Sequence, residues 1–183
     1  INALSIAGHR GDGRRWVMFS FFGGGHGGHP QGDGLNHGNA PISTATIPPL
    51  EILEAAYPVK FTQWALRPDS GGPGRHRGGL GAIYEIELLE EEATAFLFGD
   101  RGRFPPRGVA GGGDAAMTRF TYPSGGHPAH PPLASKVVDV PLVRGDRVRL
   151  ETPGGGGYGD PAERDPAAVR RDIALGVVGE EAA

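Results

Sequence analysis

The chain has 183 residues, a formal net charge of −3 and no cysteine, with 33 glycines and 17 prolines. This length is typical of one domain, and the lack of cysteine excludes disulfides, thiolate metal ligands and a cysteine nucleophile. The near-neutral charge argues against nucleic acid as the main partner, because phosphate binding needs a concentrated basic face. No apolar run approaches the length of a membrane span and no signal-peptide pattern is present, so we expect a cytoplasmic protein without a membrane partner.

Apolar runs alternate with clusters of glycine and proline along the whole chain. The hydrophobic fraction of 38% and the low net charge favour a folded chain over a disordered one. Apolar patterning predicts short strands at residues 15–22, 59–66, 80–89, 93–98, 116–122, 137–143 and 147–152. Charged turns at 90–92 and 144–146 each predict an antiparallel hairpin between the strands that flank them.

Two short helices complete the predicted elements, one near 49–57 and one near 166–175. The second begins with an Asp165 N-cap and is expected to stop at Gly176. We therefore predict an α+β, mainly β fold, built from short antiparallel strands and hairpins with glycine-rich turns. A single domain is expected over 1–183.

Within this domain we expect three parts. Residues 1–46 form a Gly/His-rich entry segment, 47–160 a mainly β body, and 161–183 a C-terminal helix and tail.

Two segments match the dinucleotide-binding pattern G-x-G-x-x-G, at residues 23–28 and 154–159. That pattern requires a helix to open directly after the glycines, so that the helix N-terminus can receive a pyrophosphate. Prolines and further glycines follow the first segment, and Pro161 lies between the second and the next helix. We expect neither segment to bind ATP alone. The glycines of the second segment are expected to permit close backbone approach at a packed corner or subunit interface.

A histidine-rich loop follows the first glycine segment, with the spacing H-x2-H-x3-D-x3-H. The four side chains are His26, His29, Asp33 and His37. Neutral imidazoles and a carboxylate are suitable ligands for first-row metals, so a divalent metal site is one hypothesis. The alternative is a polar loop with solvated histidines.

The stretch 66–81 concentrates charge among glycines and prolines, and apolar strand-like sequence flanks it on both sides. We expect a tightly specified set of turns, because Pro68 and Pro73 fix φ while Gly71, Gly72 and Gly74 can reach positive φ. Arg67, Asp69 and Ser70 are its candidate catalytic residues. Ser70 as a nucleophile would need a histidine base within about 3 Å, and His76 is the only nearby candidate in sequence.

A second charged pair, Asp100 and Arg101, follows the strand at 93–98 and is a candidate substrate-binding pair. If that strand is a neighbour of the strand at 59–66, the two charged clusters would lie together. Such an arrangement could be a structural ion network or an anion-binding site.

Four ordered motifs carry a family resemblance. They are Leu-Arg-Pro-Asp-Ser-Gly-Gly-x-Gly-x-x-Arg-Gly-Gly from Leu66, Gly99-Asp100-Arg101 with Phe104-Pro105-Pro106, Gly111-Gly112-Gly113, and Thr152-Pro153-Gly154-Gly155-Gly156-Gly157-Tyr158-Gly159-Asp160-Pro161. In this order they resemble the hydantoinase B/oxoprolinase family, the B-type subunits of ATP-dependent hydantoinases and their ketone-carboxylase relatives. The resemblance implies that this chain is the C-terminal part of a longer subunit.

The resemblance also implies an activity. It would be ATP-dependent opening of a cyclic amide, such as a hydantoin, N-methylhydantoin or 5-oxoproline, or the related ATP-driven carboxylation of a ketone. ATP and Mg²⁺ would belong to a hetero-oligomeric complex with an A-type subunit, and this chain alone would not bind them. The alternative is a catalytically inert structural or partner-docking domain, and we expect no turnover from the isolated chain.

Overall fold

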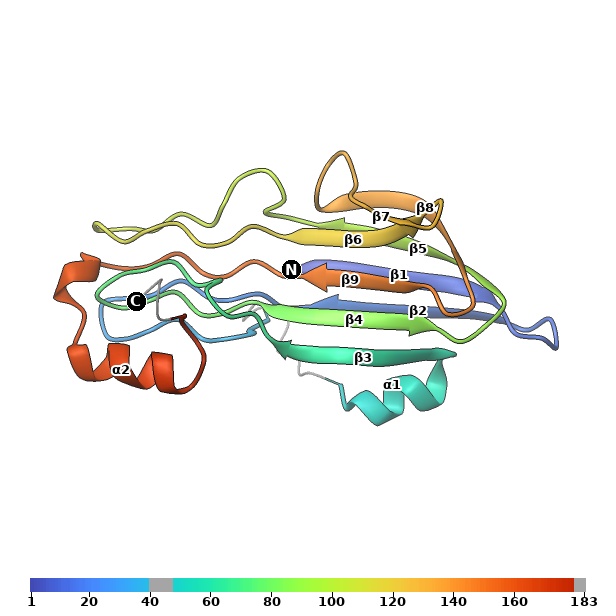
Figure 1. Cartoon of the computed structure of the whole chain (residues 1–183), viewed down its shortest axis with the longest axis horizontal. Helices are drawn as coiled ribbons and strands as arrows, with labels where there is room; N and C mark the ends of the chain where they lie inside the picture. The colour runs from blue at the N-terminus through green and yellow to red at the C-terminus, as the bar shows by residue number, and fades with distance from the viewer. Residues whose placement is uncertain (40–47, 180–183) are drawn as a thin grey trace.

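The computed structural model describes residues 1–39 and 48–179 of the chain. It is mainly β, as predicted, with two antiparallel sheets (Figure 1). The four-stranded sheet has the order β2-β1-β5-β8 and the five-stranded sheet the order β3-β4-β9-β6-β7. The strands are β1 (Asn2–His9), β2 (Arg15–Phe22), β3 (Val59–Leu66), β4 (Ala82–Leu88), β5 (Glu92–Gly99), β6 (Arg119–Ser124), β7 (His127–Ala129), β8 (Lys136–Val143) and β9 (Arg147–Glu151).

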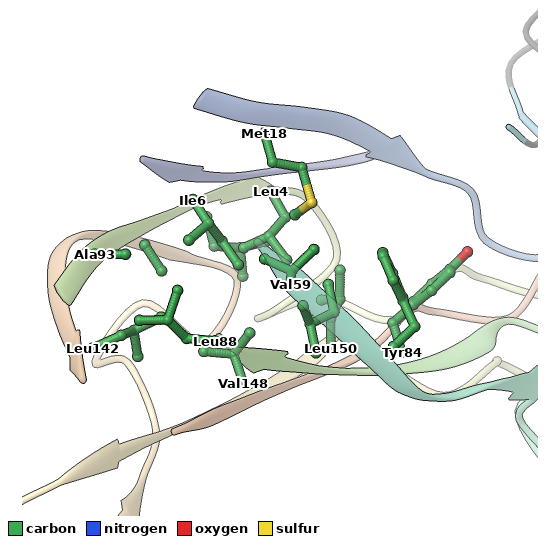
Figure 2. Packing of buried hydrophobic residues seen from close by; sticks show 14 of the residues in the cluster. Leu4, Ile6, Met18, Val59, Tyr84, Leu88, Ala93, Leu142, Val148 and Leu150 are labelled. Atoms are coloured by element: carbon green, nitrogen blue, oxygen red, sulfur yellow. The ribbon is translucent and has the colours of Figure 1, made fainter. Parts of the chain in front are cut away.

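The two sheets enclose one hydrophobic core, because alternate residues of each strand point inward. Strand β2 shows the pattern most simply, with every second side chain buried from Trp16 to Phe22. Figure 2 shows side chains of the two sheets meeting between them: Leu4 and Ile6 come from β1, and Val148 and Leu150 come from β9. This packing makes the molecule a β-sandwich.

Both predicted hairpins are wrong, because the chain changes sheets at each turn. Strands β4 and β5 belong to different sheets, and so do β8 and β9. The two crossings lie side by side, where Gly145 N donates to Leu88 O at 2.9 Å and Arg144 N donates to Glu91 O at 3.1 Å. Gly145 has a φ of 86°, so the glycine predicted at this turn is required by the backbone. Corner turns and hairpin turns use the same residue types, so local pattern cannot separate them.

The two helices lie close to their predicted positions. Helix α1 (Leu50–Ala56) packs against β3 through buried Leu53. Helix α2 (Pro166–Ala174) has the predicted N-cap, since the Asp165 carboxylate accepts from Ala167 N at 2.9 Å. The chain leaves α2 through Gly176, with a φ of 64°. None of the helices within 1–39 and 48–179 has the length and apolar character of a membrane span.

Two strands were not predicted, β1 and the short β7. The predicted boundary at residue 46 and the final four residues of the predicted tail lie outside the described residues.

Candidate functional site

Beyond the strand ends, glycine-rich segments run side by side in extended conformation and form what we call the glycine layer (Figure 1). Its segments are residues 23–28, 33–38, 71–79, 108–113 and 154–159. Hydrogen bonds join them laterally: Gly28 N donates to Gly156 O at 2.8 Å, and Gly155 N donates to Gly79 O at 2.9 Å. Segments far apart in sequence are thus held together by their backbones.

Glycine is required in this layer because the backbones approach too closely to leave space for side chains. A Cβ built on Gly155 would lie 1.8 Å from His26 O, and one on Gly157 would lie 1.9 Å from Pro73 O. A substitution at either position would therefore push two main chains apart. This agrees with the predicted close backbone approach in the segment 154–159.

The glycines of the stretch 66–81 have the same role, which differs from the predicted one. The predicted turns with positive φ do not form at Gly71, Gly72 or Gly74. At Gly72 a Cβ would meet Gly113 O at 2.2 Å. The prediction was wrong for these positions because lateral crowding, and not turn geometry, selects glycine there.

The layer does not fit a nucleotide phosphate. Gly25 N donates to Pro153 O and Gly28 N to Gly156 O, so these amides of the first G-x-G-x-x-G segment already have partners. The chain continues from Gly28 in a short bridged loop at His29, and no helix opens there. Phosphate-binding glycine loops need free backbone amides at a helix N-terminus.

A largely buried ion cluster joins helix α2 to the glycine layer. Arg164 donates to both oxygens of Asp33, at 2.8 Å each, and to Asp172 at 2.6 Å. Arg77 completes the cluster through Nε, 3.2 Å from Asp172. The four residues come from the loop after the first glycine segment, the stretch 66–81, the link before α2 and α2 itself.

The electrostatics of the cluster favour its ionised form. Burial alone would raise the pKa of the Asp33 carboxyl, but hydrogen bonds and charge from Arg164, with a contribution from Arg77, hold that pKa below its usual value. The same hydrogen bonds, which Arg164 donates to Asp33, raise the pKa of the Arg164 guanidinium, so Arg164 is always charged. Two carboxylates and two guanidiniums balance, so the cluster presents no net charge to a ligand.

A pocket of about 530 Å³ lies beside the ion cluster. Its wall combines Arg77, Arg164 and Asp172 with small apolar residues, including Pro73, Pro161 and Val178. Arg77 and Arg164 bind Asp172, whereas Asp69, which also lines the pocket, accepts from Gly179 N. The pocket is therefore a mostly apolar space whose polar wall contains paired charges and one further carboxylate.

The three candidate catalytic residues lie in one place but have structural partners. Arg67 donates to Met117 O at 2.8 Å and to Thr152 O at 3.2 Å. Ser70 is buried, and its hydroxyl donates to Arg67 O at 2.6 Å while it accepts from Gly81 N at 2.9 Å.

Asp69 ties the stretch 66–81 to the end of the described chain. Its carboxylate accepts from Gly179 N at 2.7 Å, and its own amide donates to Val177 O. The base proposed for Ser70 makes no hydrogen bond with it: the Ser70 hydroxyl binds Arg67 O and Gly81 N, and the backbone of His76 pairs with Tyr158. The structure therefore shows no activated serine here.

Among the described residues, the candidate substrate-binding pair forms no ion pair with Arg67 or Asp69. Strands β3 and β5 belong to different sheets, so the predicted four-charge cluster does not form. Asp100 instead lies 3.8 Å from Lys136, and the charged neighbour of Arg67 is Glu151, also at 3.8 Å. Arg101 has a φ of 60° and lines a separate pocket with Asp100.

The four candidate metal ligands are not brought together either. His26 Nε2 lies 2.9 Å from Asn39 O, His29 Nδ1 lies 3.2 Å from Gln31 Oε1, and Asp33 binds Arg164. Over the described ranges, no three histidine or carboxylate side chains are placed to hold an ion. The predicted cluster fails because each side chain has a different partner along the extended loop, so a metal does not fit these residues.

The fourth of these residues, His37, belongs to an aromatic cluster at the end of the sandwich core. Its Nε2 accepts from the Tyr84 hydroxyl and from Trp64 Nε1, the latter at 3.3 Å. Burial lowers the pKa of His37 and raises that of Tyr84. Both groups are therefore neutral at pH 7, as this donor–acceptor arrangement requires.

A family match covers most of the chain. The model of the family "Hydantoinase B/oxoprolinase" matches residues 1–161. The chain belongs to the hydantoinase B/oxoprolinase family. Among its relatives is a putative B-type D-/L-hydantoinase subunit from Pseudomonas sp. strain NS671, 29% identical over 92% of this chain and 28% of the relative.

Solved structures of two ATP-dependent enzymes have the same fold. The caprolactamase of Pseudomonas jessenii matches 98% of this chain and 32% of its own, with 29% identity and a TM-score of 0.81. An acetone carboxylase matches 99% of this chain and 28% of its own chain, with 25% identity and a TM-score of 0.80. This hydantoinase B family chain thus spans about 28% of the curated relatives that it matches first.

Sequence patterns did not point to the ion cluster of this family member. Arg164 and Asp33 are 131 residues apart, and Arg77 and Asp172 are 95 apart. One local signal was present: Asp172 is three residues after Val169 and adjacent to Ile173, so it lies on the apolar stripe of α2. A carboxylate on a buried stripe indicates a buried cationic partner.

Proposed function

We propose that this chain is the C-terminal part of a B-type subunit in an ATP-dependent enzyme that opens cyclic amides of the hydantoin or 5-oxoproline type. Within that subunit it acts as a rigid module that shapes the assembly. The chemistry is carried out by residues elsewhere in the complex. The need for ATP supports a cytoplasmic location for the reaction.

The observation that carries this proposal is the internal pairing of the polar groups in the glycine layer. Backbone amides that could hold a phosphate donate to neighbouring carbonyls, and the Ser70 hydroxyl has both a donor and an acceptor partner. The guanidinium of Arg164 is matched by two carboxylates. Groups used in this way stabilise a fold and are not free for a substrate.

In the proposed assembly, ATP and Mg²⁺ are handled with an A-type partner subunit, which makes the enzyme a hetero-oligomer. When bound there, ATP supplies the phosphoryl group that activates a carbonyl oxygen. The residues of this chain hold the architecture: Asp69 and Arg164 fix the end of α2 against the glycine layer. The pocket of about 530 Å³ between these elements is the place where a partner segment could insert.

A second candidate function is a part in ATP-driven carboxylation of a ketone. The TM-score of 0.80 to an acetone carboxylase chain favours it, and it nearly equals the TM-score to the caprolactamase. Both candidates share ATP-dependent activation of a carbonyl compound, and they differ in what then attacks it.

The test is to purify a B-type subunit that carries this sequence with its A-type partner. Phosphate release is measured with hydantoin, with 5-oxoproline, and with acetone plus bicarbonate. We expect ATP turnover that depends on a cyclic amide and on both subunits. Turnover only with acetone and bicarbonate would favour the second candidate, and turnover by this chain alone would contradict the proposed structural role.

A further inference from the structure

The outer face of the four-stranded sheet carries large apolar side chains. Along β2 and β5 the outward positions alternate with buried ones, and they are occupied by Val17, Phe19, Phe21, Phe96 and Phe98. Phe19 is 56% exposed, Phe21 53% and Phe98 72%. A contiguous set of exposed aromatic side chains on a sheet face marks an interaction surface.

A groove runs along the middle of this face, over β1. The outward residues of β1 are small: Ala3, Ser5 and Ala7. In the sheet register Ser5 lies between Phe19 and Phe96, and Ala3 lies between Phe21 and Phe98. Two aromatic ridges therefore flank a floor of small residues, and we call this feature the β1 groove.

The width of the β1 groove suits an α-helix. Neighbouring strands are about 4.8 Å apart, so ridges on β2 and β5 are separated by about 10 Å. A helix of about 10–12 Å diameter is too wide to enter between the ridges as a whole, but it can lie along β1 with one row of its apolar side chains between them. A hollow of about 690 Å³ continues the groove toward the β1–β2 turn, and its lining includes Ala7, His9, Thr94 and Pro141.

The ends of the groove carry charges of both signs: Glu90, Glu91 and Glu92 line the hollow together with Arg10 and Arg15. Arg15 shares the outward face of β2 with Phe19 and lines the hollow. Across the described ranges, no carboxylate forms an ion pair with Arg15. At the other end Lys136 Nζ lies 5.1 Å from the ring centre of Phe98 and 3.8 Å from Asp100 Oδ1. Because carboxylates lie beside the cations at both ends, the apolar side chains and not the charges define what the groove can bind.

We propose that the β1 groove is filled by an α-helix with an apolar stripe, which comes from the part of a family-length B-type subunit outside these 183 residues. This chain corresponds to 28% of the acetone carboxylase chain and 32% of the caprolactamase chain. Most of a family-length chain is therefore available to cover the face. The proposal rests on family membership and on the shape of the sheet, and it does not depend on which reaction the enzyme performs.

The test uses the complete subunit in its complex and exploits the lack of cysteine in this sequence. Ser5→Cys places a thiol in the floor of the groove, and Ser124→Cys places a control thiol at the exposed end of β6. Maleimide labelling of each site is followed by mass spectrometry in the native complex and in urea. In the native complex we expect position 5 to react at least 100-fold more slowly than position 124, with equal rates in urea.

A benzophenone amino acid at position 19 then identifies the occupant. The expected crosslink joins position 19 to a segment of the same subunit with apolar residues at helical spacing. Equal labelling of the two thiols in the native complex would overturn the proposal. So would a crosslink to position 19 or its neighbours in a second copy, detected by mixing isotopically labelled and unlabelled subunits. Labelling reports burial and not turnover, so a protected thiol in an inactive complex would count only against the proposed reaction.

Discussion

The two halves of this molecule are packed by different means. In the sandwich, side chains such as Leu4 and Leu150 interdigitate between two sheets, and the backbones stay apart. In the glycine layer the backbones themselves are in contact, and Gly155 has no space for even one additional carbon atom. Side-chain packing tolerates exchanges of similar volume, whereas backbone packing tolerates none. The two halves should therefore respond to mutation in opposite ways.

The largest effect is expected for Gly155→Ala. Its Cβ would overlap the carbonyl group of His26, so we expect a loss of more than about 4 kcal/mol in the free energy of unfolding, which is exceptional for one methyl group. Urea unfolding followed by circular dichroism measures it. Gly11→Ala is the matched control, because a Cβ at Gly11 meets nothing within 4 Å. A loss below about 1 kcal/mol for Gly155→Ala would show that the layer can yield.

Disruption of the ion cluster should cause the second-largest loss in the free energy of unfolding. Arg164→Gln leaves Asp172 buried without its closest cation, and removal of one partner from a buried pair costs about 3–5 kcal/mol. Arg147→Gln removes a partner of Glu87 from a half-exposed ion pair at 2.7 Å and should cost less than about 1 kcal/mol. Equal losses in the two variants, measured by urea unfolding, would contradict a structural role for the cluster.

A graded response is expected in the sandwich. Leu150 is fully buried, so Leu150→Ala should cost about 2–5 kcal/mol through the cavity that it leaves. Leu150→Met nearly conserves volume and should cost less than about 1.5 kcal/mol. The ratio of the two losses sharpens the contrast with the glycine layer. If Leu150→Met lost as much unfolding free energy as Leu150→Ala, the sandwich would tolerate substitution no better than the glycine layer does.

The smallest effect is the pH dependence of the ion cluster. The pKa of Asp33 is lower in the folded chain than its ordinary value, so the unfolded state binds more protons. Its stabilising contribution is therefore complete above about pH 4–5 and is lost as pH falls through the folded pKa.

The variant Asp33→Asn should flatten the fall of the unfolding free energy below about pH 4. The exposed Asp139→Asn is the control, and it should retain the wild-type profile. Urea midpoints measured between pH 3 and pH 7 make the comparison. If the unfolding free energy of Asp33→Asn falls as steeply with pH as that of the wild type, the Asp33 carboxyl is not the cause of the acid destabilisation.

Sequence patterns predicted the local elements well and their pairing poorly. The strands at 15–22 and 59–66 were predicted with their observed bounds, because apolar alternation reports which face of a strand is buried. Strand β1 was missed because Ala3, Ser5 and Ala7 give a weak alternation. Those same small residues form the floor of the β1 groove.

The candidate site shows the same limit. Asp69 and Ser70 were selected from a local cluster, and they do lie at a junction, where they bind backbone atoms. The ion cluster depends on residues brought together only by the glycine layer, and no local pattern reports that. Composition gave one correct indication, since many glycines in clusters predicted close backbone contact at 154–159.

Hydrogen exchange of individual amides tests most directly the claim that the glycine layer is a packed structure. Gly28 N and Gly155 N donate to carbonyls of neighbouring segments at 2.8 and 2.9 Å. The account predicts protection of these two amides comparable with that of Ile86 N in the centre of β4, near the level set by global unfolding. Exchange of Gly28 and Gly155 at the rates of an open loop, with Ile86 still protected, would contradict it.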